Sequence, residues 1–176
     1  MSTLQMATNT GNSWTTTIII NTSLQSHETI RMLQAQRHKI RLSDSVELDS
    51  FVFPQSGTAF KLVEPEKVKD QSILVEQIQK FVALHQNSFV LFYSPFNRET
   101  QQKMLSFIQE RFFGSKLYIL PVRNNDEIIN GMLTIAKATT KPHVDCILNR
   151  MATIRSEILD ISPVLEMYKK LTKAPE

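Results

Sequence analysis

The chain has 176 residues, of which 41% are hydrophobic, and its net charge at pH 7 is +3. This length suits one domain with an appendage, and the apolar fraction is large enough to build a core. A single cysteine, Cys146, excludes an internal disulfide and a multi-cysteine zinc site, which fits a reducing compartment such as the cytosol or nucleus.

The two ends of the chain differ in composition from its middle. Residues 1–13 are rich in Thr, Ser and Asn, which predicts a disordered tail, and residues 173–176 form a second short tail. Purely apolar runs are only a few residues long and none follows a basic start. We therefore expect neither a secretory signal nor a membrane helix.

The first half of the folded chain combines three kinds of pattern. Residues 14–21 are rich in β-branched side chains and predict a strand, and residues 26–36 have helical spacing. Alternation over residues 39–43 predicts a second strand. Residues 51–63 read as a β-hairpin, because the turn 54–57 contains both Pro and Gly.

The second half alternates regularly between helix and strand. Residues 66–84 and 97–112 carry apolar stripes of helical period, while residues 88–94 and 116–122 are apolar runs of strand length. Such alternation predicts an α/β domain with a mainly parallel sheet and helices on both faces.

The helix predicted over residues 126–138 has an unusually wide apolar surface. A helix that covers one sheet needs about a third of its circumference to be apolar. The surplus fits either a surface for a neighbouring protein or a well-buried final helix. The apolar positions are Ile128, Ile129, Met132, Leu133, Ile135 and Ala136.

A helical C-terminal segment over residues 139–172 follows the domain at 14–138. Pro142 suits the first turn of a further helix, and Ser162 with Pro163 starts a short last helix through Leu171. Cys146 falls on the expected inward side of the first of these helices, where it is predicted to be a core thiol. The apolar positions of that helix are Val144, Ile147, Leu148, Met151, Ile154 and Ile158.

Charge is unevenly distributed along the chain. Residues 137–173 contain seven Lys or Arg and four Asp or Glu, which accounts for the whole net excess of +3. This mildly basic segment suits contact with phosphates, and a solvated helix face is the alternative interpretation.

Several kinds of chemistry lack the residues that they need. Only four glycines occur, so neither a Walker loop nor a dinucleotide-binding fingerprint can be assembled. The four histidines are far apart in sequence, without the close spacing of zinc ligands on one helix. We expect no cofactor, no metal site and no catalytic residue.

One acidic group deserves comparison with metal-dependent nucleases of similar topology. Asp44, Glu47 and Asp49 precede the hairpin, and such nucleases also need a Glu-x-Lys on the second hairpin strand to complete the metal site. Lys61 is present, but Ala59 and Phe60 occupy the two positions where the carboxylate would stand. The acidic group therefore reads as a solvated loop.

The order of elements resembles the central domain of the XPF nuclease family, especially its catalytically inactive partner subunits. Four segments together resemble the meiotic sporulation-sixteen family, and the resemblance covers roughly residues 14–163. These segments are Trp14–Ile20, His85–Phe89, Ile119–Val122 and Thr134–Lys137.

The resemblance implies a non-catalytic subunit that pairs with the larger, XPF-like shortage-in-chiasmata protein. The pair is expected to bind branched DNA recombination intermediates and to promote crossover formation and synapsis on meiotic chromosomes in the nucleus. A tandem helix-hairpin-helix module needs two glycine-bearing hairpins, yet no glycine follows Gly131. The C-terminal segment is therefore expected to be a reduced helix-hairpin-helix-like unit.

Two sets of residues are candidates for these contacts. The partner-binding candidates are Ile128, Ile129, Met132, Ile135, Ile147 and Met151. The DNA-binding candidates are Lys137, Lys141, Lys169 and Lys170. Two alternatives remain open at this point: an α/β adaptor that binds protein only, and an active metal-dependent nuclease.

Overall fold

A six-stranded sheet forms the centre of the protein, with strand order β2-β1-β3-β4-β5-β6. The structure is a computed structural model that describes residues 13–161, 167, 170 and 171. Residues 1–12 of the predicted tail at 1–13, the predicted tail at 173–176 and most of the short last helix lie outside this range. The strands are β1 (Thr17–Ile20), β2 (Lys39–Leu42), β3 (Ser50–Phe53), β4 (Thr58–Val63), β5 (Asn87–Tyr93) and β6 (Leu117–Val122).

The sheet is mixed, and parallel pairings predominate. β1 pairs in parallel with β2, and β4, β5 and β6 form a second parallel set. β3 is antiparallel to both β1 and β4, so β3 and β4 form the hairpin that Pro and Gly at the turn predicted. The predicted α/β fold is confirmed.

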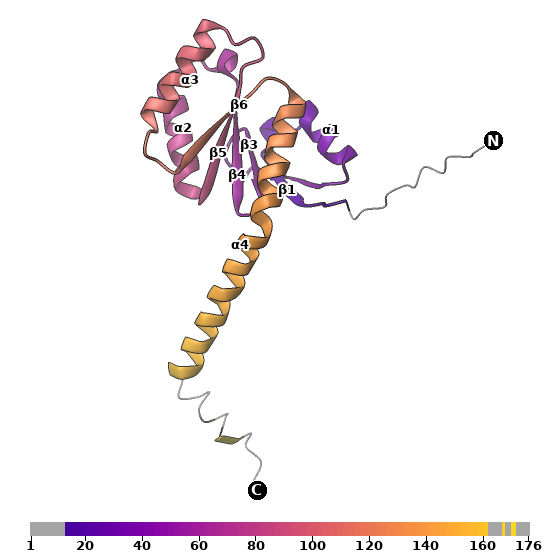
Figure 1. Ribbon diagram of the computed structural model, residues 1–176, viewed down its shortest axis with the longest axis vertical. Helices are drawn as coiled ribbons and strands as arrows, with labels where there is room; N and C mark the ends of the chain where they lie inside the picture. The colour runs from indigo at the N-terminus through magenta and orange to yellow at the C-terminus, as the bar shows by residue number, and fades with distance from the viewer. Residues whose placement is uncertain (1–12, 162–166, 168–169, 172–176) are drawn as a thin grey trace, which may run out of the picture.

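Two helices cover each face of the sheet (Figure 1). α1 (Glu28–Ala35) and the first part of α4 (Asn125–Ile161) pack on one face, and α2 (Gln71–Leu84) and α3 (Glu99–Arg111) pack on the other. Asp70 is the N-cap of α2: its carboxylate accepts a hydrogen bond of 2.8 Å from the Ser72 N–H. Short 3-10 turns at Thr22–Leu24 and Pro65–Lys67 complete the connections.

The two faces of the sheet carry separate apolar cores. On the α1/α4 face, Ile18, Phe60 and Leu91 are buried together with side chains from both helices. On the other face, Val90 and Phe92 pack with residues of α2 and α3. The alternation of side chains along each strand therefore divides its residues between two layers.

The structure corrects the prediction of a separate helix that begins at Pro142. α4 runs without interruption from Asn125 to Ile161 and contains Pro142 in its interior. The Thr139 hydroxyl donates to the Ile135 carbonyl at 2.8 Å, and the Thr140 hydroxyl donates to the Ala136 carbonyl at 2.7 Å. These bonds add polar contacts in the turn before the proline, a pattern seen in bent helices. Up to residue 161, the described C-terminal segment therefore holds one helix and no hairpin.

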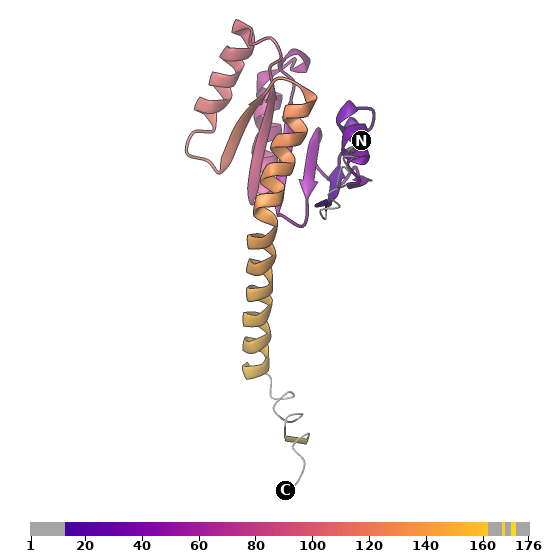
Figure 2. The ribbon, with the colours of Figure 1, turned by 45° about the vertical axis from the view of Figure 1, so that its right-hand side comes forward.

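The second part of α4 projects away from the sheet (Figures 1 and 2). None of the described helices, this long one included, has an apolar stretch that could cross a membrane.

Candidate functional site

The first part of α4 belongs to the core of this chain. Ile128, Ile129 and Met132 are at most 1% exposed, and Ile135 is half-buried against the same core. The expectation that Ile128, Ile129 and Met132 bind a partner is therefore wrong, because their side chains are already covered within the chain.

A second neighbour explains why the apolar surface of this helix is so wide. α4 packs against α1 as well as against the sheet, and side chains of all three share one core. Ile30 and Leu33 of α1 are both buried there. A helix with two covered flanks needs a wider apolar surface than a helix that lies on a sheet alone.

The second part of α4 exposes a continuous apolar surface, which we name the projecting stripe. Its six side chains are between 40% and 61% exposed. Apart from the adjacent pair Ile147 and Leu148, successive positions are three or four residues apart, the spacing that aligns side chains along one face for a partner helix. The predictions for Ile147 and Met151 fall on this stripe and stay predictions. The stripe consists of Val144, Ile147, Leu148, Met151, Ile154 and Ile158.

His143 marks the point where α4 leaves the sheet. Its ring lies against the backbone of Gly57, at the turn between β3 and β4. A Cβ atom added to Gly57 would stand 2.4 Å from the ring carbon Cε1, which is shorter than any ordinary contact. Gly57 also has a φ of +65°. Both observations explain why glycine occupies the turn.

The DNA-binding candidates that the structure describes are all exposed. Lys137 and Lys141 are exposed, as is Lys170, whereas Lys169 lies outside the described residues. All four remain predictions as DNA contacts.

The prediction that Cys146 is a core thiol is wrong, because the helix has already left the sheet at this position and the thiol is exposed.

The β4 positions that were compared with a nuclease metal site hold two apolar core residues and one buried lysine. Ala59 and Phe60 on β4 are fully buried, and Lys61 is 2% exposed. The Lys61 Nζ donates a hydrogen bond of 2.7 Å to the Leu48 carbonyl. Burial lowers the pKa of Lys61, and the negative charges of Asp49 and Glu47 oppose this effect.

The three acidic side chains near the hairpin bind different partners. Asp49 accepts from the Ser23 hydroxyl at 2.9 Å, and Glu47 lies 2.6 Å from the Nε2 of His85. Asp44 accepts from a threonine hydroxyl of the 3-10 turn at Thr22–Leu24. Throughout the described part of the chain, no three His, Cys, Asp or Glu side chains converge in a way that could hold a metal ion.

A cleft of about 670 Å³ opens next to Lys61. Asp49 and Asp70 line it together with Lys61, Lys67 and His27, whose pKa is lowered by burial. Because groups of both charges surround the cleft, it has no uniform electrostatic character.

Sequence reasoning missed one charged surface, which we name the basic edge. It consists of Arg31, Arg37, Lys39 and Arg41, which α1 and β2 bring to the outer border of the sheet. Residues 29–43 contain these four cations and no Asp or Glu. Counting charged residues over positions 29–43 would have identified this surface, whereas the net charge of the whole domain does not reveal it.

The comparisons with known proteins agree with this fold and with the sequence motifs. The family model described as Protein SPO16 homolog matches residues 12–171. The human Protein SPO16 homolog is 42% identical over 160 residues, which cover 90% of this chain and 89% of the human protein.

Two solved structures of XPF from Aeropyrum pernix have the same fold at 8% sequence identity. The structure in complex with DNA has a TM-score of 0.59 and covers 72% of this chain and 66% of the XPF chain. The other has a TM-score of 0.60 and covers 70% and 61%, so the match spans less than two thirds of either XPF chain.

The chain has an XPF nuclease-like fold, and its own β4 carries no carboxylate. Within that fold class, the chain belongs to the family of Protein SPO16 homologs. The prediction of the sporulation-sixteen family is confirmed.

Proposed function

We propose that this chain is the non-catalytic subunit of an XPF-like heterodimer that binds branched DNA recombination intermediates. In this proposal it promotes crossover formation and synapsis on meiotic chromosomes in the nucleus. The larger subunit is the XPF-like shortage-in-chiasmata protein. Membership of the SPO16 family and the XPF-like fold support this assignment.

The projecting stripe is the observation that carries the proposal. Residues 144–158 extend about 22 Å along the helix axis, at 1.5 Å per residue, and present six exposed apolar side chains on one side. An exposed apolar surface of this kind marks an interaction site in a folded protein. A helical surface of the larger subunit would cover it through knobs-into-holes packing.

The absence of a carboxylate on β4 supports a non-catalytic role. Ala59 and Phe60 occupy the positions of the required acid, and Lys61 is already bonded to the Leu48 carbonyl. In this proposal the chain contributes binding surfaces, among them the exposed Lys137 and Lys141, and the larger subunit contributes the rest of the DNA contact.

Co-expression with the larger subunit tests the assignment. Ile147→Asp with Met151→Asp is expected to abolish co-purification, because a carboxylate buried at an apolar interface costs several kcal/mol. The stability of the domain should change by less than about 0.5 kcal/mol, since both side chains are exposed. The control is Asn149→Asp with Thr153→Asp, which adds the same charge elsewhere on the same helix and should leave pairing intact.

Two results would count against the proposal. Undiminished co-purification of the Ile147 and Met151 variant would place the interface elsewhere. A heterodimer that forms normally but does not bind four-way junctions or single-stranded DNA would indicate a protein-only adaptor.

A further inference from the structure

The basic edge presents cations that few carboxylates neutralise. Arg37, Lys39 and Arg41 are exposed, and within residues 13–161 none of them forms a salt bridge. Arg31 lies 3.9 Å from Glu28, and its side chain is 83% exposed. On other surfaces, Lys67 and Lys103 each pair with a nearby glutamate, whereas Lys80 and Lys116 form no salt bridge within residues 13–161.

The cations follow the direction of an edge strand. Among the residues that the structure describes, β2 pairs only with β1, so no described strand covers its other side. Lys39 and Arg41 are two residues apart on β2, and their Cα atoms are therefore separated by about 6.6 Å on the same face of the strand. Arg37 lies before the strand, where its φ of +65° turns the chain, so the row on β2 consists of Lys39 and Arg41. Asp44, whose carboxylate accepts a hydrogen bond from Thr22, ends it.

The backbone of β2 adds hydrogen-bond donors to this surface. The N–H groups of Lys39 and Ser43 donate inward, to the carbonyls of Thr16 and Ile20. Because donors alternate along a parallel strand, the N–H groups of Ile40 and Leu42 point outward. Cationic side chains and free N–H groups together are the donors that proteins use to contact phosphate oxygens.

His38 and Trp14 lie next to the row without adding charge to it. The Nδ1 of His38 accepts a hydrogen bond of 3.3 Å from the Thr16 N–H, so this nitrogen carries no proton. Trp14 packs edge-on against His38, with 5.8 Å between the ring centroids. Trp14 is the sole tryptophan of the chain, so its fluorescence reports on this surface alone.

We propose that the basic edge binds the phosphate backbone of nucleic acid. This inference rests on the proposed function and assigns a DNA contact of the complex to α1 and β2 of this chain. A group of exposed cations along one border of the sheet fits a polyanion. Among the exposed side chains of β2, only Leu42 is apolar, so this strand offers little apolar surface to a folded protein.

DNA binding by the full-length chain tests the inference. The probes are single-stranded, duplex and four-way-junction oligonucleotides, and the readouts are Trp14 fluorescence and the dependence of affinity on salt. Arg37→Glu with Arg41→Glu is expected to weaken binding at least tenfold. The slope of log K against log salt should fall by about 2, because each lost phosphate contact contributes about 0.9.

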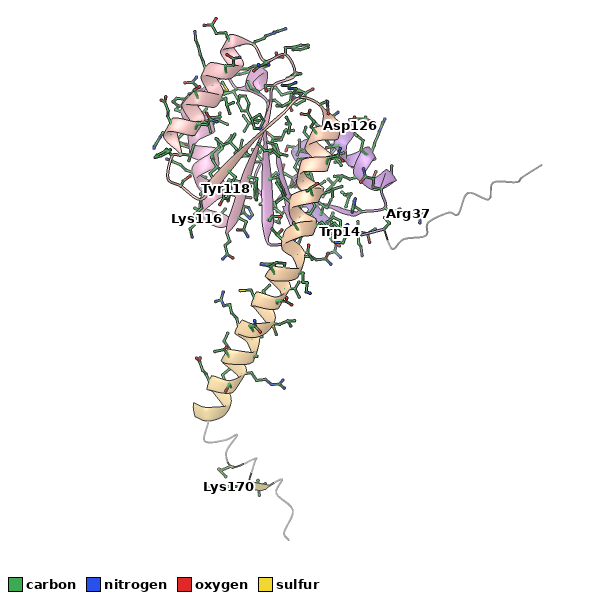
Figure 3. The ribbon with its side chains drawn as sticks, viewed as in Figure 1. Trp14, Arg37, Lys116, Tyr118, Asp126 and Lys170 are labelled. Carbon is green, nitrogen blue, oxygen red and sulfur yellow. The ribbon has the colours of Figure 1, made fainter. Side chains whose placement is uncertain are left out.

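A matched control has the same change of charge on another surface. Lys80→Glu with Lys116→Glu should leave affinity within about twofold of wild type. Lys116 lies across the body of the protein from Trp14 and Arg37 (Figure 3). Urea unfolding of all variants verifies that each folds.

Each other outcome has a distinct meaning. If wild type binds DNA and the Arg37 and Arg41 variant binds with unchanged affinity and salt slope, the inference fails while the proposed function stands. Equal weakening by the control pair also overturns it, because net charge alone would then explain binding. If polyglutamate binds more tightly than DNA and changes Trp14 fluorescence, the edge binds an acidic protein instead. If wild type does not bind DNA, both this inference and direct DNA binding by the chain fail.

Discussion

Gly57 and Gly114 have similar backbone conformations but different surroundings. Their φ angles are +65° and +76°. A Cβ atom at Gly57 would collide with His143, whereas one at Gly114 would meet no atom within 4 Å. Comparing alanine substitutions at the two positions therefore separates the free-energy cost of backbone strain from that of steric overlap.

We predict that Gly114→Ala lowers the free energy of unfolding by about 1–2 kcal/mol, the cost of left-handed backbone. Gly57→Ala should cost about 2–5 kcal/mol, because overpacking against His143 adds about 1–3 kcal/mol. Urea unfolding measures both values. His143→Ala in the Gly57→Ala background should recover the steric part of the loss. Equal costs at the two glycines would show that the His143 contact relaxes freely.

The buried charge of Lys61 has a consequence for stability against pH. Burial lowers its pKa below the ordinary value of 10.5. The unfolded chain therefore binds this proton more strongly than the folded chain. Stability accordingly rises as pH increases through the folded-state pKa towards 10.5.

Replacement of Lys61 by Met should remove this rise. We predict that the unfolding free energy of wild type, minus that of Lys61→Met, increases from neutral pH towards pH 10.5. Chemical denaturation over a series of pH values provides the measurement. A difference that stays constant with pH would mean that the folded and unfolded chains bind this proton equally.

At the scale of elements, α4 is one continuous helix whose two parts have different surroundings. Its first part is a core helix, and its second part projects with an apolar stripe. Pro142 lies between them. A proline in a helix interior removes one hydrogen bond and costs about 3 kcal/mol.

We predict that Pro142→Ala strengthens the helix at this junction. Amide hydrogen exchange of residues 143–150 should slow by at least about tenfold, because 1.4 kcal/mol of added local stability is enough for that change. Exchange within β4 and β5 serves as the internal reference and should not change. Faster exchange after the substitution would indicate that Pro142 itself stabilises the contact of His143 with the turn.

At the scale of the whole molecule, this chain has an XPF-like fold but carries no carboxylate on β4. Ala59 and Phe60 are buried core residues, and the three nearby acids already have hydrogen-bond partners. A metal site needs several converging oxygens and a supporting shell of hydrogen bonds.

We therefore predict that the purified chain does not cleave single-stranded, duplex or branched DNA with magnesium or manganese. Ala59→Glu alone should not create activity, because one added carboxylate does not complete a metal site. Gel assays with an active nuclease as positive control measure this. Metal-dependent cleavage that Asp49→Ala abolishes would contradict the prediction.

The sequence alone determined the order and type of most elements. The hairpin at 51–63 and the alternation of helices and strands over 66–122 are confirmed, because periodicity and turn residues act over a few neighbouring positions. The family was also identifiable from short segments of sequence.

Tertiary structure decided which side chains of α4 are covered. Met132 is buried in the core that α4 shares with α1 and the sheet, and Cys146 is exposed because the helix has left the sheet. The helix also continues through Pro142, because whether a proline ends a helix depends on the packing of the segments before and after it. The basic edge appears only when α1 and β2 lie at the border of the sheet. Burial and surface charge depend on residues distant in sequence, so local pattern cannot determine them.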